Sequence, residues 1–304
     1  MSSAVSMSGS GVNGSPQPRA ARGAPPTRRG FTSASREGRW GTRILLGVVI
    51  VWFAVLILAP IAALVWGTCD AGLGAALAAL RTPTAREAFN LTIGVTIAAV
   101  LINTFFGVVL ALVLARQRFG GKLLLEGLID LPFSVSPVVA GFMFIILFGP
   151  QGWLGRWFEA GGIRVVFAVP GIVLATIFVT LPFVTRELVP VLRECGLEQE
   201  EAARTLGANG WQTFWRVTVP SVRWGLGYGI TLTVARALGE FGAVLVVSGS
   251  IIGKTQTATL FIHQEFTDFH YEGAFAASLV LAVVSFCLLV AMELIQKRMQ
   301  QERS

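Results

Sequence analysis

Residues 201–220 read EAARTLGANGWQTFWRVTVP, and the first half of this stretch predicts a short helix that ends at a glycine. We expect the helix to run from Glu198 to Leu206, because acidic residues near its beginning interact favourably with the helix dipole. Two small residues within it, Ala202 and Ala203, allow another surface to approach closely. Gly207 then supplies the left-handed residue with which many helices end.

The second half of the stretch predicts an amphipathic segment. Trp211, Phe214 and Trp215 recur at helical spacing, and Pro220 is expected to force a new helix start. Two short helices joined by a turn form a knob suited to a groove in a partner protein. The alternative is an amphipathic helix that lies on a membrane surface, for which tryptophan and arginine are equally suited.

Long apolar segments lie on both sides of this stretch. Of the 304 residues, 54% are hydrophobic and only 13% are charged, whereas soluble domains carry about 25% charged residues. Roughly 17–25 apolar residues cross a bilayer. Six segments meet this length: 44–66, 91–115, 126–148, 165–185, 225–247 and 274–292. The sequence therefore predicts an all-α, multi-pass protein of the cell membrane with six transmembrane helices.

The positions of arginine and lysine favour one orientation of these spans. The basic residues concentrate in segments 1–43, 116–122, 186–223 and 297–304, which share one side of the membrane if the spans alternate. Cytoplasmic loops hold such an excess, so we predict that both termini are cytoplasmic. Residues 1–43 are expected to form a disordered basic tail and 297–304 a short cytoplasmic C-terminus. Because the tail holds most of the net charge of +7, that charge does not indicate nucleic-acid binding.

Residues 248–255, SGSIIGKT, are close to the phosphate-binding pattern G-x-x-x-x-G-K-[ST], with Ser248 in place of the first glycine. The apolar residues before it extend back to Gly225, which is too long for a typical strand and suits a spanning helix. The predicted topology also places the loop on the outer side, away from cellular ATP. We interpret SGSIIGKT as a helix end and a turn, and expect no nucleotide site there.

The loop between the fourth and fifth predicted spans resembles the EAA loop of membrane subunits of binding-protein-dependent ABC importers. That pattern, E-A-A-x3-G-x9-I-x-L-P, matches Glu201, Ala202, Ala203, Gly207 and Pro220, with Val217 and Val219 at the two aliphatic positions. The resemblance implies a type I ABC importer permease fold. It also implies that the five matching residues dock a cytoplasmic ATPase, in which ATP and magnesium are expected to bind, with no cofactor held by this chain.

Three further segments resemble the W-type permease subunits of sulfate/thiosulfate importers: DLPFSVSPVVAG (130–141), IFVTLPFVTRELVPVL (177–192) and RALGEFGAVLVVSGSI (236–251). The resemblance covers residues 44–296, with a core of about 88–296 and the coupling loop at 193–223. It implies a permease that is not an enzyme and has no catalytic residues. A molybdate or tungstate permease is the alternative, because those systems share RALGEFGAV. The implied partners are a related second permease in a heterodimer, two ATPase subunits and an extracytoplasmic sulfate-binding protein.

Charged residues within the spans are candidates for the anion pathway. Arg236 and Glu240 are four residues apart within the fifth predicted span and therefore share one helix face. A charge in the membrane costs roughly 2.5–3.5 kcal/mol, which favours pairing. We therefore prefer a structural ion pair to a gate that meets the anion. The third span carries the kink-forming Pro132 and Pro137. Its two carboxylates, Glu126 and Asp130, could repel an anion or pair with Lys122, and we prefer the pairing.

Metal-binding patterns are weak in this sequence. Its three cysteines, Cys69, Cys195 and Cys287, show no metal-ligand spacing. The segment HQEFTDFH (263–270) contains two histidines and two carboxylates, for which a metal site is conceivable. The preferred interpretation is a hydrated outer surface where the binding protein docks, and we predict no metal site.

Overall fold

The structure is a computed structural model that describes residues 36–70 and 72–303, and every regular element in these ranges is a helix. The chain divides into two compact units, residues 1–56 and 57–304, each considered by itself. The described part of the first unit is the beginning of α1 (Arg36–Asp70), whose side chains from residue 41 are largely exposed and apolar. α1 extends beyond the predicted span 44–66 at both ends. Most of the predicted basic tail lies outside the described residues.

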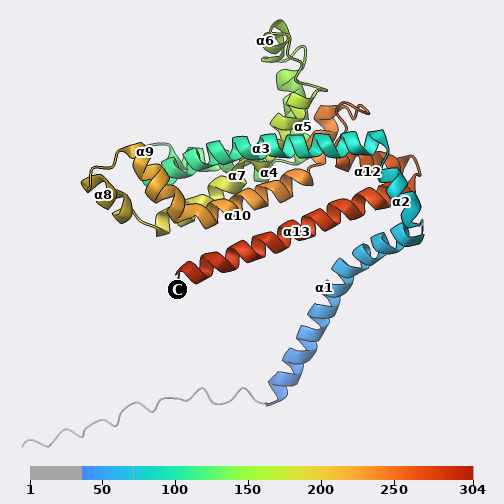
Figure 1. The fold of residues 1–304 in the computed structure, drawn as a ribbon, viewed down its shortest axis with the longest axis horizontal. Coiled ribbons are helices and arrows are strands. Elements are labelled where there is room, and N and C mark those ends of the chain that lie inside the picture. Colours follow the sequence, from blue (N-terminus) through green and yellow to red (C-terminus); the bar gives the residue numbers. More distant parts are fainter. Residues whose placement is uncertain (1–35, 71, 304) are drawn as a thin grey trace, which may run out of the picture. The chain divides into compact units, whose positions relative to one another are not determined.

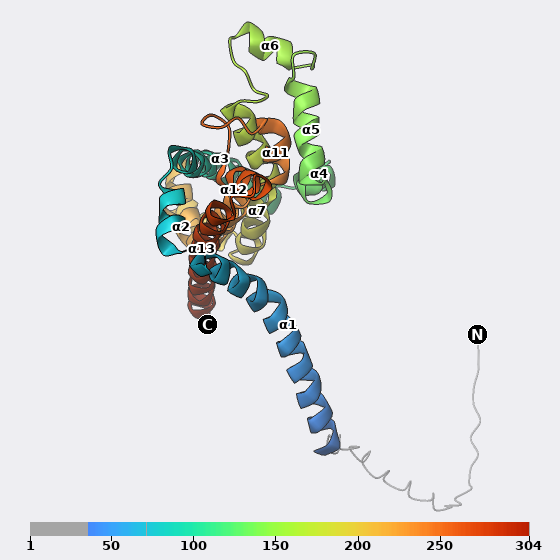
Figure 2. The ribbon, with the colours of Figure 1, turned by 90° about the vertical axis from the view of Figure 1, so that its right-hand side faces the viewer.

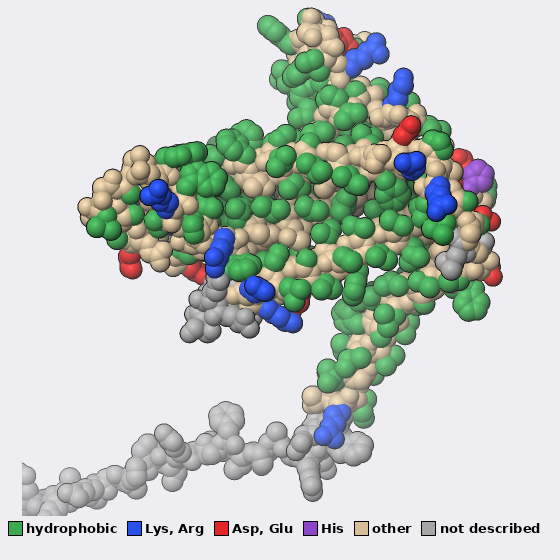
Figure 3. Space-filling view, viewed as in Figure 1, with side chains coloured by type: hydrophobic (Ala, Val, Ile, Leu, Met, Phe, Trp, Pro, Cys, Tyr) green, Lys and Arg blue, Asp and Glu red, His purple; other side chains and the backbone are tan. Residues whose placement is uncertain are grey.

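Long helices form the body of the second unit: α3 (Pro83–Arg116), α7 (Val169–Glu194), α10 (Val219–Leu238) and α13 (Tyr271–Arg303). α3 packs against α7, α7 against α10, and α10 against α13, so the helices run lengthwise beside one another (Figure 1). Small residues permit this close packing: a methyl group added at Gly107 would lie 2.8 Å from Cβ of Val184. Hydrophobic side chains cover most of the visible flank of this body, with charged groups nearer its ends (Figure 3).

Two of the six predicted spans are broken helices. Among the described residues, α1, α3, α7 and α13 are long and apolar enough to cross a membrane alone, and six spans result if each bent pair counts as one. The third predicted span, 126–148, consists of α4 (Lys122–Ser134) and α5 (Pro137–Phe148), which meet at 110°. Pro137 begins α5 and holds Ser136 in an extended conformation, so the predicted kink is confirmed as a full break.

The predicted continuous fifth span, 225–247, is wrong. α10 ends at Leu238 and α11 (Gly242–Ser248) begins after a 54° bend. The break contains Glu240, whose side chain caps the beginning of α11 instead of continuing the face of α10, because its Oε1 accepts a hydrogen bond from the N–H of Ala243 at 2.9 Å.

Short helices occupy the two ends of the body. α8 (Glu198–Thr205), α9 (Gly210–Thr213) and the π-helix η1 (Phe214–Thr218) lie at one end; α2 (Leu73–Leu80) and α12 (Ala258–Thr267) lie at the other (Figure 1). α5 and α6 (Gly155–Ala160) project sideways from the long helices as an arm (Figure 2). The EAA-like loop and the SGSIIGKT loop are thus at opposite ends of the unit.

Candidate functional site

The predicted short helix and glycine turn of the EAA-like loop are confirmed. α8 ends at Thr205, and Gly207 has a φ of 90°, in the left-handed region that favours glycine. The turn is closed by a hydrogen bond of 3.0 Å from the N–H of Ala208 to the carbonyl of Ala203. A capping box follows, in which Asn209 and Gln212 exchange side-chain and backbone hydrogen bonds and start α9. We call residues 198–218 the knob.

Pro220 does not start a separate helix, contrary to the sequence prediction. The helical segment is uninterrupted from α9 through η1 into α10, and Pro220 lies in the first turn of α10. The N–H of Val219 bonds to the carbonyl of Phe214, five residues back, as in a π-helix. This wider turn lets the helix pass a residue that has no N–H to donate.

The knob presents an exposed apolar surface at its tip. The exposed fractions are 89% for Leu206, 70% for Trp211 and 52% for Trp215. The rings of Trp211 and Trp215 pack edge to face at 5.7 Å, so they form a preformed aromatic patch. Of the five motif residues, Glu201, Ala202, Gly207 and Pro220 are exposed and Ala203 is half-buried. All five are therefore accessible in this chain.

A buried carboxylate that the motif does not include ties the knob to α3. Oε1 of Glu200 lies 2.8 Å from Nη2 of Arg116, the last residue of α3, and accepts a hydrogen bond of 3.0 Å from Thr218 in η1. The side chains of Arg116 and Glu200 are only 15% and 11% exposed. Sequence reasoning missed this contact because Arg116 is far away in the chain. No local pattern distinguishes Glu200 from Glu201, because the apolar residues next to α8, Leu197 and Leu206, are themselves exposed.

The predicted Arg236–Glu240 ion pair is present, although the two residues are not on one continuous helix. Nη1 of Arg236 lies 2.7 Å from Oε2 of Glu240, and the Glu240 side chain is 1% exposed. Its backbone carbonyl also accepts a hydrogen bond of 2.8 Å from Thr259 near the start of α12. Glu240 therefore joins α10, α11 and α12: one carboxylate oxygen accepts the hydrogen bond from Ala243 and the other lies against Arg236.

The predicted pairing of Glu126 and Asp130 with Lys122 is wrong, because both carboxylates pair across to α7. Asp130 accepts two contacts from Arg186: Nε to Oδ1 at 2.6 Å and Nη2 to Oδ2 at 2.5 Å. Glu126 lies 3.4 Å from Nη2 of Arg193. The four groups line a crevice of about 350 Å³ between α4 and α7. Lys122 instead begins α4, four residues before Glu126.

SGSIIGKT has the geometry of a helix end and a compact turn, as predicted. Ser248 is the last residue of the helix α11, where a phosphate-binding loop would follow a strand. Thr255 donates a hydrogen bond of 2.7 Å to the carbonyl of Ser248 and accepts one of 3.0 Å from the N–H of Ile251. Backbone groups that would hold a phosphate in a P-loop are used within this turn.

The two histidines of segment 263–270 face different neighbours. The ring of His263 packs against Phe241 at 5.3 Å, whereas Nδ1 of His270 lies 4.0 Å from Oε2 of Glu265. The described residues contain no group of three metal-ligating side chains.

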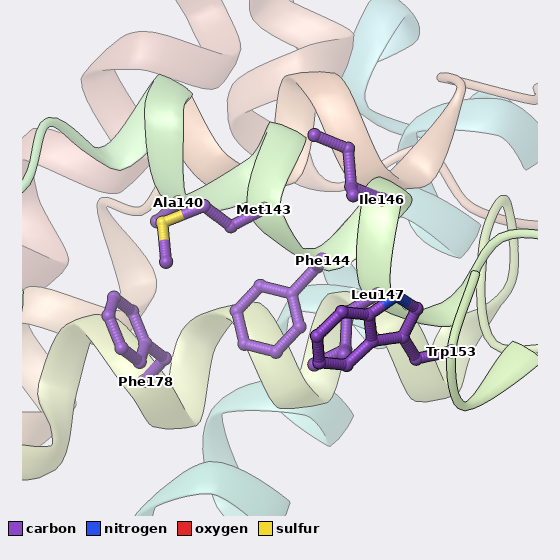
Figure 4. A pocket seen from close by; sticks show the side chains of 7 residues that line it. All are labelled: Ala140, Met143, Phe144, Ile146, Leu147, Trp153 and Phe178. Atoms are coloured by element: carbon purple, nitrogen blue, oxygen red, sulfur yellow. The ribbon is translucent and has the colours of Figure 1, made fainter.

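A second large hollow, of about 540 Å³, lies between α5 and α7 (Figure 4). It is lined by apolar side chains, with Phe144, Trp153 and Phe178 turned toward it. An apolar lining does not suit a hydrated anion, so this hollow is not a candidate for the ion pathway.

Comparison with known proteins gives consistent results. Residues 103–301 match the family described as binding-protein-dependent transport system inner membrane component. The chain is 48% identical to the sulfate transport system permease protein CysW of Synechocystis sp., over 84% of this chain and 92% of that one. It is 42% identical to CysW of Escherichia coli K12 (88% and 92% covered) and 35% identical to the sulfate permease protein CysT of the same strain (88% and 97%).

Solved structures show the same fold at low sequence identity. A chain of a bacterial ABC transporter that imports the acidic polysaccharide alginate superposes with a TM-score of 0.72 at 16% identity, covering 86% of this chain and 96% of that one. A second structure of a bacterial alginate transporter, in complex with an alginate-bound periplasmic protein, also gives a TM-score of 0.72.

Proposed function

The chain belongs to the family of binding-protein-dependent transport system inner membrane components, and we propose that it is the W-type permease subunit of an ATP-driven sulfate importer. It is a multi-pass membrane protein. The observation that carries the proposal is the knob: an exposed docking surface fixed to the end of a spanning bundle, in a chain 48% identical to a sulfate permease. Thiosulfate is a second substrate of the proposed importer.

In the proposed mechanism the knob couples this chain to a cytoplasmic ATPase. Glu201, Ala202, Ala203, Gly207 and Pro220 dock in a cleft of that subunit, with Leu206 and the two exposed tryptophans as apolar anchors. ATP and magnesium bind to the ATPase, and this chain performs no covalent chemistry. Closure of the two ATPase subunits moves the knob and shifts the permease between inward-facing and outward-facing populations.

The proposed complex contains a second, related permease and an extracytoplasmic sulfate-binding protein. Escherichia coli K12 has two distinct sulfate transport permease proteins, CysW and CysT, and this chain is 42% and 35% identical to them. Two related permeases in one strain support a second permease in the proposed complex. The α5–α6 arm supplies a surface for it, because Phe142, Ile146 and Trp153 are exposed on the arm beside the apolar hollow. The binding protein is supported by the alginate transporter bound to its periplasmic protein.

A molybdate or tungstate importer is the second candidate, because RALGEFGAV is shared with those systems. The sulfate permeases among the relatives favour sulfate over this alternative.

The proposal is tested by purifying the chain with its second permease, ATPase and binding protein, and reconstituting the complex in proteoliposomes. Binding protein loaded with sulfate is expected to stimulate ATP hydrolysis and to drive uptake of radiolabelled sulfate. Molybdate at the same concentration is the matched control and should give neither response. Uptake of molybdate but not of sulfate would favour the molybdate or tungstate importer. Sulfate uptake without ATP would identify a passive channel and would overturn the proposal of an ATP-driven importer.

A further inference from the structure

The crevice between α4 and α7 exposes four charged side chains on helices that also carry long apolar runs. The exposed fractions of the side chains are 55% for Arg186, 50% for Arg193, 36% for Asp130 and 38% for Glu126. Both arginines lie in the last third of α7, at the end that leads to the knob and that the predicted topology places on the cytoplasmic side, and charged residues of spans face a bundle interior or a water-filled cavity. This side of the chain therefore faces water or protein in the assembled transporter, not lipid.

The charged groups form two levels along the crevice. Arg186 and Arg193 are seven residues apart on α7, which places them about two helical turns, or roughly 10 Å, from each other. Each faces a carboxylate of α4, closely at Asp130 and loosely at Glu126, where the distance is 3.4 Å. A small anion that leaves one arginine can thus reach the next within the same crevice.

A third polar group points to a ligand in this crevice. Thr185 lines it, is 1% exposed, and its hydroxyl oxygen has no hydrogen-bond partner in the described part of the chain. Buried hydroxyls usually have a partner, so an unpaired one beside Arg186 marks a place where a bound oxygen atom would be stabilised.

The Arg236–Glu240 pair, also predicted as a pathway candidate, differs from the crevice pairs in the burial of its carboxylate. Its carboxylate is 1% exposed and engaged by Arg236 and by the N–H of Ala243. Opening that pair would leave a buried carboxylate without a neutralising positive charge. Opening the pairs of the crevice leaves carboxylates that water can reach, so the crevice arginines can exchange partners at much lower cost.

We propose that the α4–α7 crevice is a transit site for a tetrahedral oxyanion, with Arg186 and Arg193 as successive ligands and the Thr185 hydroxyl as an additional donor. A guanidinium group binds two oxygens of an oxyanion side by side, as it binds the carboxylate of Asp130 here. Asp130 and Glu126 take the place of the anion when the crevice is empty. Their competition keeps anion binding weak enough for release, which conduction requires. The inference rests on the proposed function and names the pathway within it.

The test uses the complete reconstituted complex and radiolabelled sulfate. Arg186→Gln is expected to lower sulfate uptake at least about tenfold, because charge-assisted hydrogen bonds to the anion are lost. ATP hydrolysis stimulated by the loaded binding protein should persist, since the knob is unchanged. The decisive variant is Asp130→Asn combined with Arg186→Gln, which restores a neutral, hydrogen-bonding pair. If Arg186 is an anion ligand, this double variant stays as slow as Arg186→Gln alone.

The matched control neutralises the exposed pair Glu293–Lys297 on α13, which lies outside the crevice. Glu293→Gln with Lys297→Gln should leave uptake unchanged. Recovery of uptake in the Asp130→Asn/Arg186→Gln variant would show that the pair is only structural and would overturn the transit site. Loss of the second permease from purified Arg186→Gln complexes would assign the charges to a subunit interface and would also overturn the transit site. Absence of sulfate uptake by the wild-type complex would instead refute the proposed function itself.

Discussion

At the scale of single residues, Gly207 shows that backbone conformation, rather than space, constrains the knob. Its φ is 90°, yet a methyl group added there would meet no atom within 4 Å. Within this chain, a substitution therefore acts through the turn, where a left-handed conformation costs a non-glycine residue about 1–2 kcal/mol. Asparagine tolerates this conformation better than other residues, whereas a β-branched residue tolerates it least.

We expect Gly207→Val to reduce sulfate uptake strongly and Gly207→Asn to reduce it little, with both variants inserted in the membrane at wild-type levels. Uptake in cells and the amount of chain in the membrane fraction are the measurements. Gly210→Ala is the matched control, because Gly210 has open space and no positive φ, and it should transport normally. Equal losses for Asn and Val would show that side-chain bulk matters at this position instead of backbone strain.

Glu200 and Glu201 are adjacent and chemically identical, but the structure gives them opposite environments. Glu201 is exposed, and Glu200 is held between Arg116 and Thr218. Which of the two is buried depends on where α3 ends, and the motif carries no information about that. Removing one partner of a buried ion pair leaves the other charge uncompensated, which costs about 3 kcal/mol.

Glu200→Gln is therefore expected to lower the melting temperature of the detergent-solubilised permease, whereas Glu201→Gln should leave it unchanged. Arg116→Gln combined with Glu200→Gln should recover much of the loss, because no unpaired charge remains. Tryptophan fluorescence during heating measures these transitions, since Trp211 and Trp215 report on the knob. A melting temperature that falls equally for both glutamates would refute a special role for the buried one.

At the scale of elements, the sequence predicted the helices well, but it predicted only one of the two breaks within spans. The break between α4 and α5 was visible because Pro137 restricts the residue before it wherever it occurs. The break between α10 and α11 was not, because it depends on hydrogen bonds from Ala243 and Thr259 to Glu240. An i, i+4 pair of opposite charges normally supports a helix, and here the same pair bridges a helix end.

The ion pairs of α4 show the same limit. Helical spacing correctly placed Glu126 and Asp130 near each other, and Lys122 was the nearest cation in the sequence. The observed partners, Arg186 and Arg193, belong to another helix, whose approach is set by packing elsewhere in the bundle. Local pattern alone thus identifies which residues need a partner, but not the partner itself.

At the scale of the whole molecule, topology decides whether the knob can reach a cytoplasmic ATPase. The knob and the turn 248–255 lie at opposite ends of the second unit. The bias of arginine and lysine toward segments 186–223 and 297–304 predicts that the knob is inside and the turn outside. Lys254 and Arg204 are both exposed, so each position is accessible to a reagent on its own side of the membrane.

Single cysteines at these two positions test this topology, with Cys69, Cys195 and Cys287 first replaced by serine. We expect Lys254→Cys to react with a membrane-impermeant maleimide in intact spheroplasts, and Arg204→Cys to react only in inside-out vesicles, because the charged reagent does not cross the bilayer. The ATPase is omitted so that nothing covers the knob. Labelling of Arg204→Cys in intact spheroplasts would place the knob outside, where no cytoplasmic ATPase can meet it, and would overturn the coupling mechanism even if sulfate uptake were observed.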